Sequence, residues 1–250
     1  MKKRPFVLWL IWQNVETRQR YHIGNLSNLD GNYTFTYELS GKRRTLLEAL
    51  ENGYRPHLAF RDIQKVYKSD RLFDAFARRL PDKGRPDFSK LLQSFGLSID
   101  YSEMDLLRAT GGRLATDPYE FVAPIYRFND HFDFDFYVAG WRYYEGEDVL
   151  NELKVGEVVK FELDIMNPKD DKAVVILTTQ SGGKLGYVPA FYSGFMFDVI
   201  KNGGKYEAKI ENININARPQ LKVNISVVGQ TDITEYDGSE FDIIEQLEIV

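Results

Sequence analysis

One run of alternating residues constrains the fold of this chain more than any other. In the stretch HFDFDFYVAG, the aromatic residues Phe132, Phe134 and Phe136 alternate with Asp133 and Asp135. Successive side chains of a β-strand point to opposite faces, so this pattern predicts a strand with one buried aromatic face and one acidic face. Such a strand needs a sheet and a core, and we expect a second folding unit to open here.

The residues after this strand predict a small closed or nearly closed β-barrel. Short apolar runs separated by turn signals follow it, together with one longer run typical of a helix. The predicted segments are VVKFELDI, AVVILTT, KLGYVPA, the helix AFYSGFMFDVIKNGG, KYEAKIENINI and QLKVNISVVG. We assign this domain to residues 130–250, and it ends in an acidic segment.

The first half of the chain mixes strands with short helices. PFVLWLIWQN and GNYTFTYEL are typical of strands, the second with Tyr33, Phe35 and Tyr37 on one face. Capping and terminating residues bound four helices, which we predict over 45–53, 70–81, 87–96 and 102–111. Helices this short are marginal alone in water and must pack on the strands. We therefore predict an α+β protein of two domains, with a small sheet or barrel and short packed helices in residues 1–125.

Composition limits the size of the core and the cellular compartment that we expect for this protein. Of 250 residues, 43% are hydrophobic and 14% aromatic, enough for one large core or two modest ones. The absence of cysteine excludes disulfides, thiolate zinc sites and a cysteine nucleophile, and it favours a reducing compartment such as the cytoplasm. Gln13 and Asn14 interrupt the first apolar run, which we interpret as a strand rather than a signal peptide. We expect no membrane span.

Charge is unevenly divided along the chain. Residues 1–137 carry a net charge of +3 and residues 138–250 carry −8, most of it in the last 20 residues. Tight binding to long duplex DNA uses many basic contacts to phosphates, and this balance does not favour it. A small pocket for a DNA end or a single strand is still compatible with it.

Side chains that carry out chemistry are poorly represented. The three histidines, His22, His57 and His131, lie far apart and lack the spacing of a metal site. No nucleophile elbow occurs, and SGGKLG at Ser181–Gly186 lacks the pattern of a phosphate-binding loop. We therefore predict no catalytic residue, no metal site and no cofactor, and we expect a protein that is not an enzyme.

The stretch VAGWRYYEGED is the strongest candidate for a binding site. It places Arg142 beside Tyr143 and Tyr144, after a predicted strand and before a glycine-bearing turn. Aromatic rings next to a guanidinium form a surface on which a nucleobase can stack. The same residues are also compatible with two tyrosines packed in the core and a solvated arginine. The sequence leaves both interpretations open.

Three motifs in residues 138–228 resemble the HIRAN domain. GWRYYEG, NPKDDKAV and KLGYVP occur in the order and at the approximate distances of that family. The resemblance implies an OB-like, six-stranded barrel with one main helix that binds the 3′ end of single-stranded DNA. It implies that Arg142 and Tyr143 stack on terminal nucleotides and that Asn167 and Asp170 hold the 3′-hydroxyl, with Tyr187 nearby.

Two positions depart from that pattern. Lys169 stands where the DNA-binding members have an aromatic residue, and Pro189 and Ala190 stand where basic residues are expected. Lys169 could replace a stacking contact with a phosphate contact. For Asn167 and Asp170, an Asx-type turn that binds no ligand explains the presence of these residues equally well.

Residues 5–122 are similar to the N-terminal subdomain of HipA-type toxin kinases. The similarity rests on HIGNLSNLDGNYTFTY, RLFDAFARRLPDKGRPDFSKLLQSFG and MDLLRATGGRLATDPYEF. The kinase signatures do not follow, so the resemblance implies protein docking rather than phosphotransfer.

Three functions are compatible with these observations. The first is recognition of single-stranded DNA 3′ ends, in DNA repair or phage defence. The second is a protein-interaction regulator that restrains a HipA-type kinase without binding DNA. The third, with least support, is a nucleic-acid hydrolase with a dispersed carboxylate site.

Overall fold

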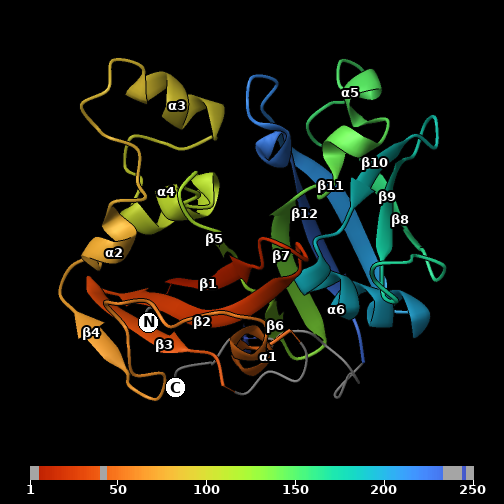
Figure 1. The fold of residues 1–250 in the computed structure, drawn as a ribbon. Coiled ribbons are helices and arrows are strands. Elements are labelled where there is room, and N and C mark those ends of the chain that lie inside the picture. The colour runs from red at the N-terminus through yellow and green to blue at the C-terminus, as the bar shows by residue number, and fades with distance from the viewer. Residues whose placement is uncertain (1–5, 40–43, 233–243, 246–250) are drawn as a thin grey trace. The chain divides into compact units, whose positions relative to one another are not determined.

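The computed structural model describes residues 6–39, 44–232 and 244–245, and the chain forms two compact units (Figure 1). The first extends to Pro124 and the second starts at Ile125. The structure is mostly β with few helices, and the four helices predicted for the first half are present but short. Most of the predicted acidic C-terminal segment lies outside the described residues.

The first unit is a five-stranded antiparallel sheet in the order β4-β3-β2-β1-β5. Its strands are β1 (Phe6–Gln13), β2 (Arg20–Leu29), β3 (Asn32–Tyr37), β4 (Tyr67–Ser69) and β5 (Tyr119–Val122). Asp30 and Gly31 both adopt positive φ, 50° and 85°, which is the geometry of a tight two-residue hairpin turn. The sheet confirms the two strands expected in this half.

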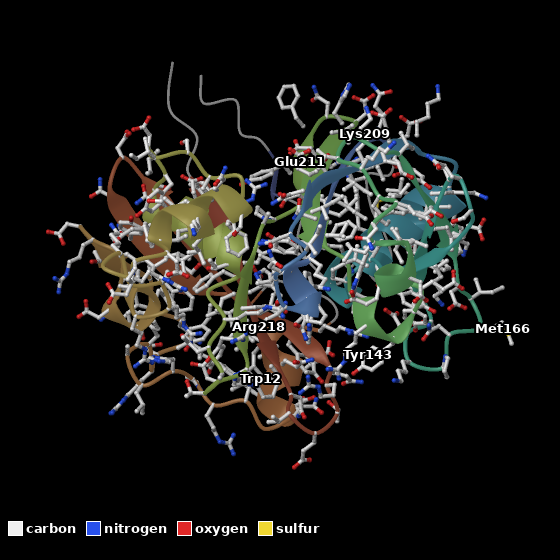
Figure 2. All side chains as sticks on the ribbon, turned by 90° about the horizontal axis from the view of Figure 1, so that it is seen from above. Trp12, Tyr143, Met166, Lys209, Glu211 and Arg218 are labelled. Carbon is white, nitrogen blue, oxygen red and sulfur yellow. The ribbon has the colours of Figure 1, made fainter. Side chains whose placement is uncertain are left out.

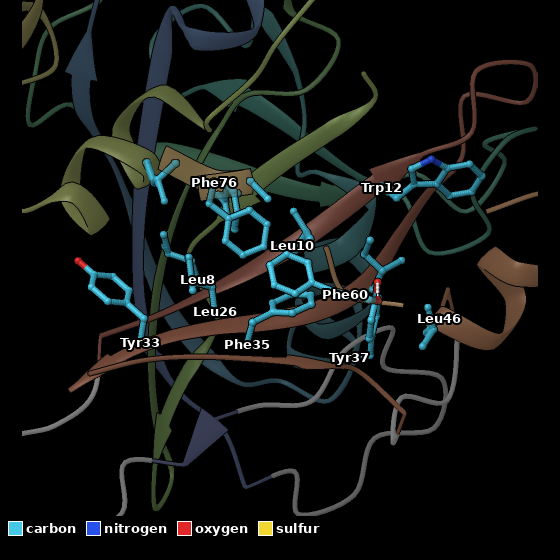
Figure 3. Close-up of a cluster of buried hydrophobic side chains, with 14 of the residues drawn as sticks. Leu8, Leu10, Trp12, Leu26, Tyr33, Phe35, Tyr37, Leu46, Phe60 and Phe76 are labelled. Atoms are coloured by element: carbon cyan, nitrogen blue, oxygen red, sulfur yellow. Dashed lines mark hydrogen bonds between the residues drawn. The ribbon is translucent and has the colours of Figure 1, made fainter. Parts of the chain in front are cut away.

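Four helices accompany this sheet: α1 (Leu46–Glu51), α2 (Asp74–Ala77), α3 (Phe88–Ser94) and α4 (Glu103–Thr110). The alternation predicted for β3 is confirmed, because Tyr33, Phe35 and Tyr37 are all buried. They belong to a core in which Phe35 lies 4.6 Å from Phe60 and 5.3 Å from Phe76, between ring centroids (Figure 3). Burial of such rings supplies most of the free energy that these short helices lack on their own.

The helix predicted over 70–81 is shorter than expected. Phe73 has extended backbone (φ −54°, ψ 134°), so α2 begins only at Asp74, and it has ended by Arg78. The chain then carries Arg79 inward, where its guanidinium donates to both oxygens of Asp117 at 3.0 and 2.5 Å and to Gly112 O at 3.1 Å. Arg79 is buried, and Asp117 satisfies its charge.

A second buried charge cluster lies on β5. Glu120 accepts from Arg113 and lies 3.2 Å from Arg20. Burial alone would raise the pKa of the Glu120 carboxyl, but the two guanidinium groups more than offset it and hold the pKa below its ordinary value. The ionised carboxylate therefore stabilises this unit.

The second unit contains two sheets, in the orders β10-β9-β8 and β11-β12-β7-β6-β13. Its strands are β6 (Tyr126–Phe128), β7 (His131–Tyr137), β8 (Val159–Leu163), β9 (Val174–Thr178), β10 (Lys184–Tyr187), β11 (Lys205–Ile213), β12 (Val223–Gln230) and β13 (Ile244–Glu245). Two single backbone bridges, Ala139 with Tyr187 and Val158 with Lys209, join the sheets in the described part. The predicted closed OB-like barrel is therefore not confirmed, because continuous ladders do not run between the two sheets.

The aromatic face of β7 is buried as predicted. Phe132 lies 4.9 Å from Phe195, and Phe134 lies 5.0 Å from Tyr192, both on the main helix α6 (Ala190–Lys201). Nearly every residue of α6 is buried, so this helix forms part of the core rather than a surface layer. The short elements η1 (Trp141–Tyr143), α5 (Gly146–Val149) and η2 (Pro219–Leu221) complete the unit.

Candidate nucleic-acid interface

The segment after β7 is held in place by a buried tryptophan. Trp141, which begins η1, is almost fully buried and donates from Nε1 to Glu147 Oε1 at 2.9 Å. Gly146 packs directly against the indole, where a β-carbon would lie 2.6 Å from the nearest ring atom. Because Trp141 fills this position, the next residues of the turn face outward.

Arg142 and Tyr143 form an exposed pair on this turn, and Figure 2 labels Tyr143. The Tyr143 side chain is 69% exposed, and the Arg142 guanidinium carbon lies 4.7 Å from the centre of its ring. Arg142 Nη2 also donates to Tyr143 Oη at 2.6 Å. The structure therefore does not pack Tyr143 into the core; it presents a ring and a guanidinium together to solvent.

A second aromatic group lies beside this pair. The Lys184 ammonium of β10 lies 4.2 Å from the ring centre of Tyr144 and 4.3 Å from that of Tyr187, and it donates to Tyr187 Oη at 2.7 Å. The two rings meet edge to face, 5.4 Å apart. Burial raises the pKa of both phenols above the ordinary value, so both are neutral near pH 7.

Gly186 allows β10 to approach this segment. Its φ of 150° is a conformation that other residues rarely adopt, and a β-carbon there would lie 2.4 Å from Ala139 O. The resulting bridge between Ala139 and Tyr187 has two hydrogen bonds of 2.9 Å. The glycine of the KLGYVP motif is therefore required for the contact between the two halves of the candidate site.

The loop from β8 to β9 is tied to the same tyrosine. Tyr187 Oη donates to Asp164 Oδ2 at 2.6 Å, and Asn167 Nδ2 donates to Asp164 Oδ2 and to Tyr187 Oη, each at 3.2 Å. The hydrogen bond from Tyr187 lowers the pKa of Asp164. These bonds fix Asn167 next to Tyr187.

Asp170 lies deeper on this loop. Its Oδ1 accepts from the Lys172 backbone at 3.0 Å, and its Oδ2 accepts from Ser193 Oγ of α6 at 3.0 Å. Asn167 Oδ1 accepts from the backbone of Lys169 and Asp170, at 3.0 and 3.3 Å, so both side chains form Asx-type turns.

The predicted residues thus fall into connected groups. Arg142 pairs with Tyr143. Asn167 hydrogen-bonds to Tyr187 and to the backbone of Asp170. Lys169 is exposed, and its positive charge acts to lower the pKa of Tyr144, against the larger effect of burial. The sequence placed Tyr144 beside Arg142 and Tyr143, but it did not predict Lys184 and Asp164 as members. Lys184 is the first residue of the KLGYVP motif, whereas Asp164 had no signal beyond its place before the Asn-Pro turn.

Comparison with known proteins gives this geometry a family context. Residues 131–232 match the HIRAN domain family. This region contains every candidate site residue named above, and it supports the resemblance drawn from the three motifs. No curated protein matches the chain.

Two crystal structures are similar to part of the chain. One is a protein from Lactobacillus plantarum, with 22% identity, a TM-score of 0.34, and coverage of 38% of this chain and 89% of that one. The other is the HIRAN domain of human HLTF, with 19% identity, a TM-score of 0.33, and coverage of 39% and 74%. The resemblance of residues 5–122 to the HipA-type subdomain stays a prediction.

Within the described ranges, the HIRAN domain and the first unit contain no group of three or more residues placed to hold a metal ion. No helix in these ranges has the length and apolarity needed to cross a membrane.

Proposed function

We propose that the HIRAN domain of this chain binds single-stranded DNA at or near its 3′ end. Domains of this family are known to bind DNA. The observation that carries the proposal is the exposed Tyr143 ring with the Arg142 guanidinium against it, next to the Tyr144, Lys184 and Tyr187 group. Stacking of a base on such a ring contributes about 1–3 kcal/mol and requires no sequence readout.

Each remaining residue has a specific part in this proposal. Lys169 is exposed on the loop and supplies a cation for a phosphate, in place of a second stacking ring. Asp170, together with Asn167, receives the terminal 3′-hydroxyl as a hydrogen-bond donor. Tyr187 contacts both the Asn167 turn and the Tyr144 ring, and it holds the two together. We propose no catalytic step, since binding accounts for these contacts.

Fluorescence anisotropy with short labelled single strands tests the proposal. Strands with a free 3′-hydroxyl should bind more tightly than strands with a 3′-phosphate, and Tyr143→Ala should weaken binding about 5- to 150-fold, the equivalent of one lost stack. Asp170→Asn should remove the preference for the hydroxyl.

The chain provides a matched control for Tyr143. Tyr101 of the first unit also has a cation over its ring, with Lys83 Nζ 5.8 Å from the ring centre. Tyr101→Ala should leave DNA affinity unchanged. Equal weakening by both substitutions, or no measurable binding by the wild-type protein, would rule out the proposed function.

A further inference from the structure

The loop from β8 to β9 carries two large apolar side chains that the fold does not bury. Ile165 is 68% exposed and Met166 is 85% exposed. Single exposed apolar residues are ordinary, but here two adjacent ones occupy the apex of a loop whose base contacts the candidate site. Figure 2 shows Met166 at the outer edge of the second unit.

The apex is held rigidly. The backbone N–H of Asn167 donates to the backbone oxygen of Asp164 at 3.1 Å and closes a four-residue turn. Ile165 and Met166 are the two central residues of this turn. The side chains at both ends of the turn bond to Tyr187 Oη, at 2.6 and 3.2 Å. A ligand that contacts this apex therefore meets an ordered surface and loses little free energy to ordering the loop.

The surroundings indicate the chemistry of that ligand. Lys169 is exposed two residues after the turn. The Lys184 ammonium lies against the ring of Tyr187, the residue that anchors the turn. A loop that carries both exposed apolar side chains and an exposed cation suits a strand in which flat bases alternate with phosphates. The thioether of methionine also makes favourable contacts with aromatic rings and adapts its shape to them.

We propose that Ile165 and Met166 form a second contact for a nucleobase, farther along the strand whose end lies on Tyr143. The inference rests on the proposed function and adds a length requirement to it. Strands too short to reach the apex gain nothing from these residues, and longer strands gain one more base contact.

The test is a double variant, Ile165→Ser with Met166→Ser, compared with the wild-type protein on strands of two lengths. On a strand of about eight nucleotides we expect binding about 5- to 30-fold weaker, the lower part of the range for one base contact. On a dinucleotide the two proteins should bind equally. Tyr143→Ala should weaken binding to both strands.

Two exposed apolar residues on other loops serve as controls. Val155 and Ile215 are 64% and 57% exposed, and Val155→Ser and Ile215→Ser should leave both affinities unchanged. Thermal unfolding checks that the double variant is folded, since removal of exposed side chains should leave its Tm unaltered.

A fluorescent base analogue, 2-aminopurine, locates the contact. Moved along the eight-nucleotide strand, it should show one internal position whose quenching on binding is lost in the double variant while quenching at the terminal position persists. If Tyr143→Ala weakens binding but the double variant matches the wild type on both strands, the apex is not a base contact and the proposed function stands. Binding of the apex to vesicles or to a protein, without loss of DNA affinity, would equally overturn the inference.

Discussion

Replacement of Gly146 by alanine tests how the buried tryptophan positions the exposed pair. A β-carbon at this position would lie 2.6–2.8 Å from three atoms of the Trp141 indole, well inside van der Waals contact. Overpacking of this kind costs about 1–3 kcal/mol. Alanine recovers about 0.5–1 kcal/mol because it is a better helix residue than glycine. The second unit should therefore lose on the order of 1 kcal/mol of stability, the difference between the centres of these two ranges.

The three tryptophans make this loss measurable in one unit. Trp141 is the single tryptophan after residue 124, while Trp9 and Trp12 belong to the first unit. With 5-fluorotryptophan incorporated, urea unfolding followed by ¹⁹F NMR separates the Trp141 resonance from the other two. We expect Gly146→Ala to shift the urea midpoint of that resonance and to weaken binding of single-stranded DNA, because the Arg142 and Tyr143 turn moves with the ring.

A matched glycine supplies the control for this experiment. Gly84 lies exposed in a loop of the first unit, where the nearest atom to an added β-carbon is a flexible Asp82 oxygen at 3.3 Å. Gly84→Ala should leave both units within about 0.5 kcal/mol of the wild type, as surface substitutions usually do. If Gly146→Ala proved as mild as Gly84→Ala, the packing of Trp141 would not control the site.

Three further predictions concern the first unit. The free energy of unfolding of this unit can be followed by the ¹⁹F signals of its tryptophans. It should hold steady above about pH 4.3 and decrease as the pH falls below that value, because Glu120 has a lowered pKa in the folded state. Glu120→Gln should flatten this pH dependence, and an unchanged slope would contradict the prediction. Asp117→Ala should cost about 3–5 kcal/mol in urea unfolding by leaving the buried Arg79 charge unpaired, whereas a loss below about 1 kcal/mol would place that charge in water. Ser102→Ala should cost about 1 kcal/mol because it removes an N-cap bond of 3.1 Å, while Ser102→Asn should retain most of the stability.

Local patterns in the sequence were sufficient to predict some of the elements. Period-two alternation gave β3 and β7, and Ser102 with Gly111 gave both ends of α4, because each depends on backbone rules that act over a few residues. The exposed turn at Arg142 and Tyr143 was also within reach, although the letters alone did not exclude packed rings.

Features that depend on contacts between distant segments could not be predicted in this way. The inward path of Arg79 depends on Asp117, 38 residues later. The aromatic group joins Tyr144 to Lys184 and Asp164 to Tyr187, pairs that only the fold brings together. The limited hydrogen bonding between the two sheets likewise reflects where each ladder stops, and strand patterns do not carry that information.

The bridge between Ala139 and Tyr187 has a mechanical consequence. The exposed turn follows a strand of one sheet, whereas Lys184 and the Asn167 loop belong to the other. A strand of DNA that contacts both the exposed turn and the Asn167 loop would link the two sheets through contacts that the protein alone lacks. Such a ligand should raise the melting temperature of the second unit, and the gain should grow with the logarithm of its free concentration above the dissociation constant.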